Sequence, residues 1–185
     1  NVPAVPPPPP TVIEAAFLGA QGPGSNTEHG RGGQILFVTN LNDSGTGSLR
    51  AAIDASGPRI VIFRVAGTIS LLSRLMIVNP FIYIAGQTAP GGGILLKGTT
   101  GNGGQMLFVR NTHDVVIRYL RIRSGKIGTS GQGQVNIAVD YGCYNVIVDH
   151  VSTSWSLDEN THIFRNIPAG VDPKTYPTIH DVTYQ

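Results

Sequence analysis

The 185-residue sequence is poor in charge and in cysteine. Charged residues make up 13% of the chain, against roughly 25% in an average soluble domain. The net charge of +2 gives no electrostatic reason to expect nucleic acid as a partner. Cys143 is the single cysteine, which excludes an internal disulfide; because it adjoins an apolar run, we expect a small buried residue. No apolar run approaches the roughly 18 residues of a membrane span.

The sequence also lacks long stretches free of helix breakers. Its 24 glycines and 13 prolines exclude a helical bundle and a coiled coil. The glycines follow no three-residue period, which excludes collagen. Hydrophobic residues reach 41%, so a sizeable core is available. Low charge and turns rich in Gly, Asn, Thr and Ser are typical of exported proteins, and we expect a secreted, extracellular location.

Three segments follow one another along the chain. Residues 1–15 are rich in proline and predict a polyproline linker or stalk, held by a neighbouring domain or chain. Residues 16–58 contain a glycine-rich loop, a short strand over 35–39 and a helix over 48–55. Residues 59–185 consist of short β-branched runs separated by Gly, Asn and Asp turns, which predict many short strands.

The helix has clear start and stop signals. Ser48 is a good N-cap, and a glycine–proline pair at 57–58 ends the helix. Leu49, Ala52 and Ile53 form one apolar stripe. An amphipathic helix at this place can cover the exposed apolar end of the first coil of a solenoid.

A repeat organises the strands of the third segment. A turn residue precedes each of four strands, whose first positions, 81, 115, 146 and 182, lie 34, 31 and 36 residues apart. Loosely constant spacing with turns of variable length predicts a solenoid, in which each coil buries its apolar face against the next. A parallel β-helix fits best, because several runs are apolar at consecutive positions. The expected strands cover residues 35–39, 60–65, 81–85, 94–96, 106–109, 115–122, 137–139, 146–151 and 182–184. A β-sandwich remains the structural alternative, although it predicts strict alternation and hairpin turns.

Several unusual strings then resemble the secreted pectate lyases. They are AFLGAQG at 16–22, GRGG at 30–33, VTNLNDSGTGSLRAAI at 38–53, IAGQTAPGGG at 84–93 and VIVDHVSTSW at 146–155. The resemblance covers residues 16–185 and implies only the N-terminal half to two-thirds of the usual domain. It implies an all-β fold, a right-handed parallel β-helix with a short N-terminal capping α-helix. It further implies calcium-assisted β-elimination of the uronates in an acidic, pectin-like polysaccharide.

The resemblance also assigns candidate calcium ligands. Asn136 lies where the family has its first acid, and Asp158 matches the first member of a later acidic pair. His162 takes the place of that pair's second acid, and imidazole is a poor calcium ligand, so Glu159 is the candidate that compensates. The family's base is an arginine in an Arg-x-Pro-x-x-Arg motif. This motif does not occur in the 185 residues, so no catalytic residue is assigned.

A basic stretch supplies the candidate substrate-binding residues. Arg121, Arg123 and Lys126 lie in a stretch that holds no acid between Asp114 and Asp140. A solvated strand face is one interpretation, and a groove for uronate carboxylates is the other. The Asp-His pair at 149–150 resembles a family motif, and its expected role is structural, hydrogen-bonding a loop at a corner of the coil.

Three functional hypotheses remain open on the sequence. The first is part of a pectate-lyase-like enzyme. The second is a non-catalytic β-helix that assembles end to end into a homo-oligomer or extracellular fibre, because no capping element follows the last expected strand. The third is a carbohydrate-binding module that keeps the groove without the chemistry.

Overall fold

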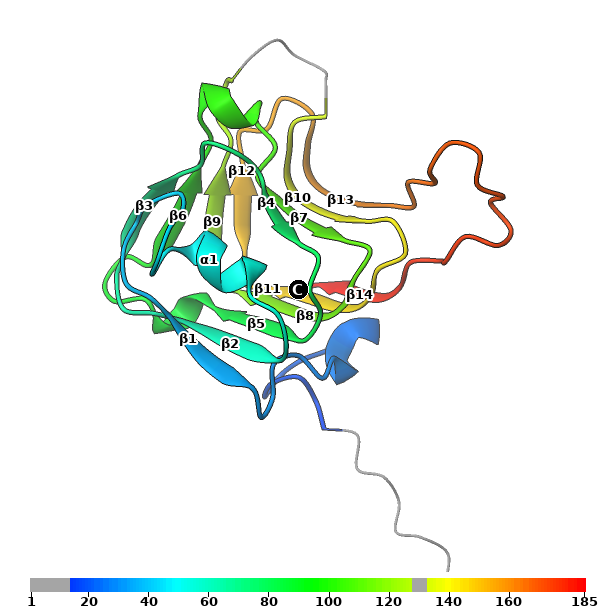
Figure 1. Ribbon diagram of the computed structural model, residues 1–185, viewed down its shortest axis with the longest axis horizontal. Helices are drawn as coiled ribbons and strands as arrows, with labels where there is room; N and C mark the ends of the chain where they lie inside the picture. The colour runs from blue at the N-terminus through cyan, green and yellow to red at the C-terminus, as the bar shows by residue number, and fades with distance from the viewer. Residues whose placement is uncertain (1–13, 128–132) are drawn as a thin grey trace, which may run out of the picture.

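The computed structural model describes residues 14–127 and 133–185 and forms a coil of three parallel sheets (Figure 1). Residues 1–13, most of the proline-rich segment, lie outside the described residues. Sheet A runs in the order β1 (Gln34–Val38), β2 (Arg59–Phe63), β5 (Ile82–Ala85), β8 (His113–Arg118), β11 (Tyr144–Asp149) and β14 (His180–Tyr184). Sheet B runs β12 (Ser152–Ser154), β9 (Leu120–Arg123), β6 (Ile94–Lys97) and β3 (Gly67–Ser70). Sheet C runs β13 (Glu159–Phe164), β10 (Val135–Asp140), β7 (Leu107–Arg110) and β4 (Leu75–Ile77).

Each coil visits the three sheets in turn, and every strand pair is parallel. The register stacks Val115, Val146 and Val182 on one another, as the repeat predicts. In the preceding coil Ile82, not residue 81, aligns with Val115, so the predicted repeat was one residue out there. The parallel β-helix is thus confirmed, and the β-sandwich is excluded.

The interior of the coil is filled by aliphatic side chains. Along each strand, side chains that point inward alternate with side chains that point outward. The inward side chains of each coil form one layer of a continuous core. Fully buried members include Ile82, Ile84, Ile117, Ile122 and Val139. Apolar area removed from water at about 25 cal/mol per Å² is the main stabilising term for such stacked coils.

Sharp corners join sheet A to sheet B. The expected single strand over 115–122 is in fact two, β8 and β9, because Tyr119 takes a positive φ of 54° and turns the chain. His150 does the same between β11 and β12, with φ 52°. Strands β3, β4, β12 and β13 were not predicted. They are short or polar, and pairing with the neighbouring coil defines them.

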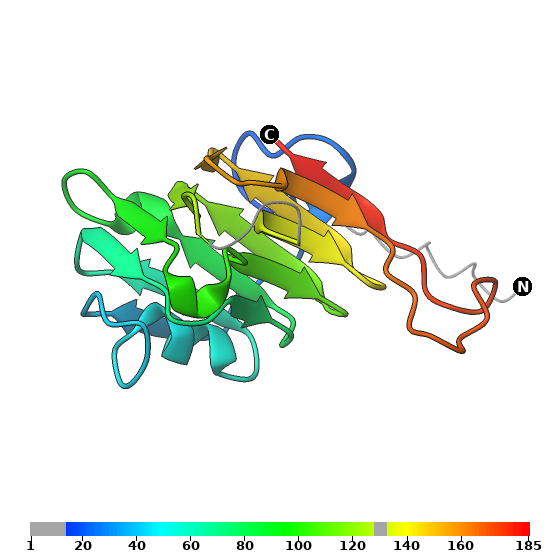
Figure 2. The ribbon, with the colours of Figure 1, turned by 90° about the horizontal axis from the view of Figure 1, so that it is seen from above.

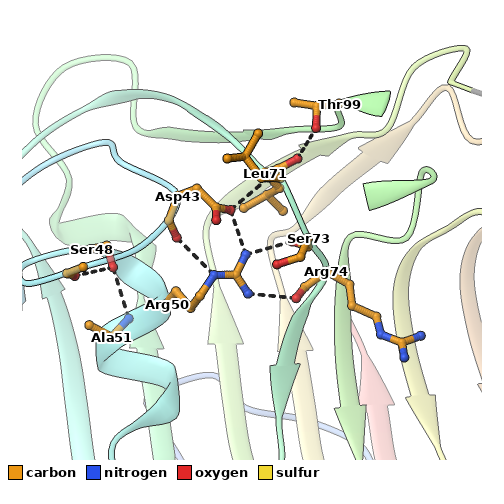
Figure 3. A network of polar contacts seen from close by, with 10 residues as sticks. Asp43, Ser48, Arg50, Ala51, Leu71, Ser73, Arg74 and Thr99 are labelled. Atoms are coloured by element: carbon orange, nitrogen blue, oxygen red, sulfur yellow. Dashed lines mark hydrogen bonds and ion pairs between the residues drawn. The ribbon is translucent and has the colours of Figure 1, made fainter. Parts of the chain in front are cut away.

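Helix α1 (Leu49–Asp54) matches its prediction and lies across the mouth of the first coil in Figure 1. The Ser48 hydroxyl accepts a hydrogen bond from the Ala51 N–H at 3.2 Å, the expected N-cap (Figure 3). Leu49, Ala52 and Ile53 are buried against the core. No helix among the described residues is long and apolar enough to cross a membrane.

Residues 14–33, here called the N-terminal strap, cover the outer face of sheet A. Ala16 is buried against Val116 and Ile147, and the 3₁₀-helix η1 (Pro23–Asn26) packs on β11 and β14. Gly24 allows this approach, because a Cβ there would lie 2.4 Å from the carbonyl oxygen of Val146. Two further 3₁₀-helices are η2 (Gly86–Thr88) and η3 (Thr100–Asn102).

A loop over residues 165–179 projects from the coil between β13 and β14 (Figure 2, orange to red). Arg165 holds it together from inside. Its guanidinium donates to the carbonyl oxygens of Pro173 at 2.7 Å, of Pro177 at 3.2 Å and of Tyr176. These contacts give the loop a defined shape where it extends away from the coil.

Candidate functional site

A groove of about 300 Å³ lies on the outer face of sheet C. Its floor comes from outward positions of adjacent strands, which the parallel register places side by side. One row holds Met76, Phe108, Ala138 and His162, and the next holds Arg110, Asp140 and Phe164. Arg74, just before β4, and Glu159, at the start of β13, also line the groove. Charged side chains from four coils thus surround an apolar floor.

Two arginines frame this groove. The Arg74 guanidinium donates to Gln105 Oε1 at 2.6 Å and lies over the Phe108 ring, 5.6 Å from its centre. The Arg110 guanidinium lies 4.0 Å from the centre of the Tyr141 ring. A guanidinium held against an aromatic ring keeps free N–H groups directed to the side, where they match the two oxygens of a carboxylate.

Helix α1 packs against β4 and positions the turn that carries Arg74 (Figure 3). Arg50 on α1 donates to the carbonyl oxygens of Arg74 at 2.9 Å and of Ser73 at 2.8 Å. Asp43 pairs with the same guanidinium at 2.7 Å. Both charged side chains of this pair are largely buried, so the turn that carries Arg74 is fixed.

Two polar atoms at the groove have no hydrogen-bond partner among the described residues, Asp140 Oδ1 and His162 Nε2. Arg110 Nε lies 3.6 Å from Asp140 Oδ1, close enough for an ion pair but too long for a hydrogen bond. Burial raises the pKa of the Asp140 carboxyl, and the positive charge of Arg110 offsets part of that effect. Buried polar atoms left unpaired are costly, so both atoms call for an explanation.

The three predicted substrate-binding residues lie elsewhere. Arg121 and Arg123 point outward from sheet B, and exposed Lys126 follows β9. Arg121 Nη2 donates to the Gly92 carbonyl oxygen at 2.7 Å. Arg123 donates to the Ser152 carbonyl oxygen at 2.6 Å and to its hydroxyl at 2.8 Å. These arginines connect neighbouring coils on a face separate from the groove.

The three predicted calcium ligands do not form an ion-binding cluster. Asn136 is fully buried; its Oδ1 accepts from the Ser124 N–H at 3.0 Å, and its Nδ2 donates to Asn160 Oδ1 at 2.9 Å. This is an amide ladder between coils, which uses both ends of the side chain. Asp158 Oδ2 accepts from the Gly133 N–H at 3.1 Å, and Glu159 Oε2 lies 3.8 Å from His162 Nδ1.

Among the described residues, no group of three His, Cys, Asp or Glu side chains is arranged to hold a metal ion. Calcium prefers six to eight oxygen ligands, several of them charged. One engaged amide and two separately occupied carboxylates do not meet this need. The side chains present therefore do not fit a calcium ion, and no chemical step is derived through one.

The Asp-His pair at 149–150 has the structural role that the sequence predicted. Asp149 is fully buried and accepts hydrogen bonds from Arg118 Nε, His150 Nδ1 at 2.7 Å and Gln185 Nε2 at 2.9 Å. Burial alone would raise the pKa of Asp149, but these three donors outweigh it and hold the pKa below its ordinary value. The pair locks the corner between β11 and β12 to the adjacent coils.

Comparisons with known proteins agree with this fold. Curated proteins similar to the chain include three named "Probable pectate lyase C". They come from Aspergillus fumigatus (48% identical over 148 residues), Aspergillus terreus (47% over 148) and Emericella nidulans (46% over 153). The matches cover 80%, 80% and 83% of this chain and 33%, 33% and 34% of those proteins, so the chain spans about a third of their length. No protein-family model matches.

A solved structure supports the architecture independently. The cedar pollen major allergen jun a 1 is 22% identical and superposes with a TM-score of 0.63. That match covers 88% of this chain and 46% of the allergen. At this level of identity the likeness concerns the fold alone, and it agrees with the parallel β-helix described above. The resemblance to pectate lyases seen in the sequence is confirmed.

Proposed function

Because the chain is a homologue of pectate lyases over 80% of its length, we propose that it binds an acidic, pectin-like polysaccharide in the groove on sheet C. The observation that supports this most directly is the pair of arginines, Arg74 and Arg110, that line the groove beside the apolar ring of Phe108. Carboxylates of successive uronate units would meet the guanidinium groups. Sugar hydroxyls would meet Asp140 Oδ1 and His162 Nε2, which have no other partner among the described residues.

The chemistry of the groove sets limits on what these residues do. Arginine presents a planar fork of donors that binds a carboxylate through two parallel hydrogen bonds, and Phe108 offers an apolar surface to the ring carbons of a sugar. An ionised Asp140 carboxylate repels a polyanion. Its ion pair with Arg110 offsets part of this repulsion. Cleavage by β-elimination would need a base, and none of the residues in this groove is assigned that role. The proposal is therefore binding, with cleavage as an activity to be assayed, and secretion as the matching location.

Two arginine variants test the location of the site. Arg110→Ala removes a groove guanidinium, and Arg121→Ala removes one from sheet B, so the two variants change net charge equally. We expect Arg110→Ala to weaken binding of trigalacturonate, measured by calorimetry, by about tenfold, because a hydrogen bond to a charged group contributes about 1.5–3 kcal/mol. Arg121→Ala should change it less than about twofold, as is usual for charges outside a site.

The opposite result would refute the groove. Loss of binding in Arg121→Ala with retention in Arg110→Ala would place the ligand on sheet B, as Arg121, Arg123 and Lys126 predict from the sequence. Absorbance of an unsaturated product on polygalacturonate, with and without a calcium chelator, separates cleavage from binding alone. Retention without product would identify a binding module.

A further inference from the structure

A ladder of aromatic rings follows the edge of sheet A at which its strands begin. Phe81, His113, Tyr144 and His180 occupy the same place on four successive coils, and we call them the ring ladder. His113 and Tyr144 stack at 4.6 Å between ring centres with an 8° interplanar angle. Tyr144 and His180 stack at 5.1 Å and 12°. The ring faces of His113, Tyr144 and His180 cover one another, so these three rings leave their edges free, whereas Phe81 meets His113 edge-on.

Carboxylates fix the orientation of both histidines. His113 Nδ1 lies 2.7 Å from Asp114 Oδ2, and His180 Nδ1 lies 2.8 Å from Asp181 Oδ2. A carboxylate only accepts hydrogen bonds, so Nδ1 carries the proton and, in the neutral ring, Nε2 keeps a lone pair. Asp114 is itself anchored, since its Oδ1 accepts from the Glu28 N–H at 2.9 Å. His113 therefore presents Nε2 as an acceptor in a set direction.

A pocket of about 440 Å³ lies against the ladder. Three ladder rings form one wall, and Asn111, Thr112 and Thr178 contribute hydroxyl and amide groups. Pro177 of the projecting loop forms the roof on the other side. The pocket is distinct from the groove on sheet C, because it lies beyond the ends of β7 and β10, and the two share no lining residue.

Thr112 gives this pocket a buried group in need of a partner. The residue is 4% exposed, and its hydroxyl oxygen makes no hydrogen bond among the described residues. Burying a hydroxyl without a partner costs about 1–3 kcal/mol, so such groups are rare and call for an explanation. A ligand hydroxyl in the pocket would satisfy it.

The charge of the pocket narrows the ligand class. Among the described residues that line it, none is Lys, Arg, Asp or Glu, and the nearest charges behind the two histidines are carboxylates. A uronate would find no cation there and two anions nearby. We propose that this pocket binds neutral, hydroxyl-rich sugar units, and that it is a second saccharide site beside the acidic-polysaccharide groove.

The spacing of the ladder suits a chain of such units. The coils repeat at about 4.8 Å, and a pyranose ring in an extended chain is of comparable length. Hydroxyl groups of successive sugar units would meet His113 Nε2, the Tyr144 hydroxyl and His180 Nε2 in turn. The Thr112 hydroxyl, at the inner end, would hold one of these units. The inference does not rest on the proposed uronate groove.

A panel of neutral trisaccharides tests it. Galactotriose, arabinotriose, xylotriose, mannotriose and cellotriose are titrated into the protein beside trigalacturonate, with binding followed by ligand-observed NMR. We expect at least one neutral trisaccharide to bind with a millimolar or lower dissociation constant. Thr112→Val, which keeps the shape and removes the hydroxyl, should weaken that binding about tenfold, because an unpaired ligand hydroxyl is then buried. Tyr144→Phe should weaken it in the same direction.

Controls keep the outcomes distinct. Thr112→Val should leave the melting temperature equal or higher, because it removes an unsatisfied buried hydroxyl. Arg110→Ala should leave neutral-sugar binding within about twofold while weakening trigalacturonate, since the two sites share no residue. Absence of binding by all five neutral sugars, or unchanged binding in Thr112→Val, overturns the proposal. Competition between trigalacturonate and the neutral sugar overturns it as well.

Discussion

Replacing Arg59 should remove a large share of the stability of the whole coil. Its side chain is fully buried between helix α1 and the second coil. It donates to five carbonyl oxygens at 2.7–3.3 Å: two lie at the end of α1, one lies in the turn after α1, and two lie in the turn before β5. The five acceptors are those of Ala52, Ile53, Gly57, Asn79 and Pro80. The guanidinium thus caps the helix C-terminus and fastens it to the next layer.

The size of the effect follows from these contacts. Five hydrogen bonds from a charged group amount to about 7–15 kcal/mol at 1.5–3 kcal/mol each. Withdrawing the cation from water costs several kcal/mol, which offsets much of that sum. We therefore expect Arg59→Met, which keeps the stem and removes every donor, to lower the free energy of unfolding by about 4 kcal/mol, the usual scale for an emptied buried network. Arg59→Lys keeps a charge and three donors and should lose about half as much.

Urea unfolding followed by circular dichroism measures both variants. Arg64→Met is the matched control, because Arg64 is exposed and lies over the Phe37 ring at 4.5 Å. It should cost no more than about 1 kcal/mol, the value of an exposed cation–π contact. If the free energy of unfolding of Arg59→Met lies within about 1 kcal/mol of that of the unchanged protein at equal m-value, Arg59 does not hold the capping helix to the coil.

Three further predictions concern titratable groups. Because the folded-state pKa of Asp149 is lowered, its contribution to the free energy of unfolding is present above the unfolded-state pKa of about 3.9 and is lost as pH falls through the folded-state pKa. Asp149→Asn should therefore reduce the loss of stability at acidic pH, measured by unfolding at a series of pH values. An unchanged loss would contradict this prediction. Burial raises the pKa of the Cys143 thiol to about 11, so iodoacetamide should label it only after unfolding, as mass spectrometry would show. Burial raises the pKa of Asp140, so its negative charge is lost at a higher pH than usual. Trigalacturonate binding should strengthen as pH falls from 7 through the folded-state pKa of Asp140, and Asp140→Asn should bind more tightly at pH 7 with a weaker pH dependence, as calorimetry would show.

Most of the fold could be predicted from the sequence. Local signals were sufficient for helix α1, because a cap, an apolar stripe and a stop all lie within ten residues of Ser48. The repeat predicted parallel stacking, since equivalent apolar positions recur in successive coils. Strands such as β12 and β13 escaped prediction, because their sequences STS and ENTHIF have no apolar period and pairing with β9 and β10 alone orders them.

Less of the candidate site could be predicted from the sequence. Arg74, Arg110 and His162 are far apart in the sequence and come together through register, which composition does not reveal. Arg121 and Arg123 were predicted to bind substrate because their charges are close in sequence. In the structure their guanidinium groups donate to neighbouring backbone and hydroxyl oxygens, contacts that the sequence does not reveal. The hydrogen bonds of Asn136 are equally non-local, since its amide joins Ser124 and Asn160, 12 and 24 residues away.

The N-terminal strap gives this molecule an unusual order of assembly. Its residues leave the ribosome early, yet two of their partners lie in β14 or directly after it: Gln21 N–H donates to Gln185 Oε1, and Gly24 N–H to Thr183 Oγ1, both at 2.9 Å. Layers can add one by one during synthesis, but this closure spans about 160 residues of chain and requires β14 to be in place. Until the strap docks, Val116 and Ile147 are exposed to solvent, so the nascent protein carries an apolar surface that a chaperone can bind or through which chains can aggregate.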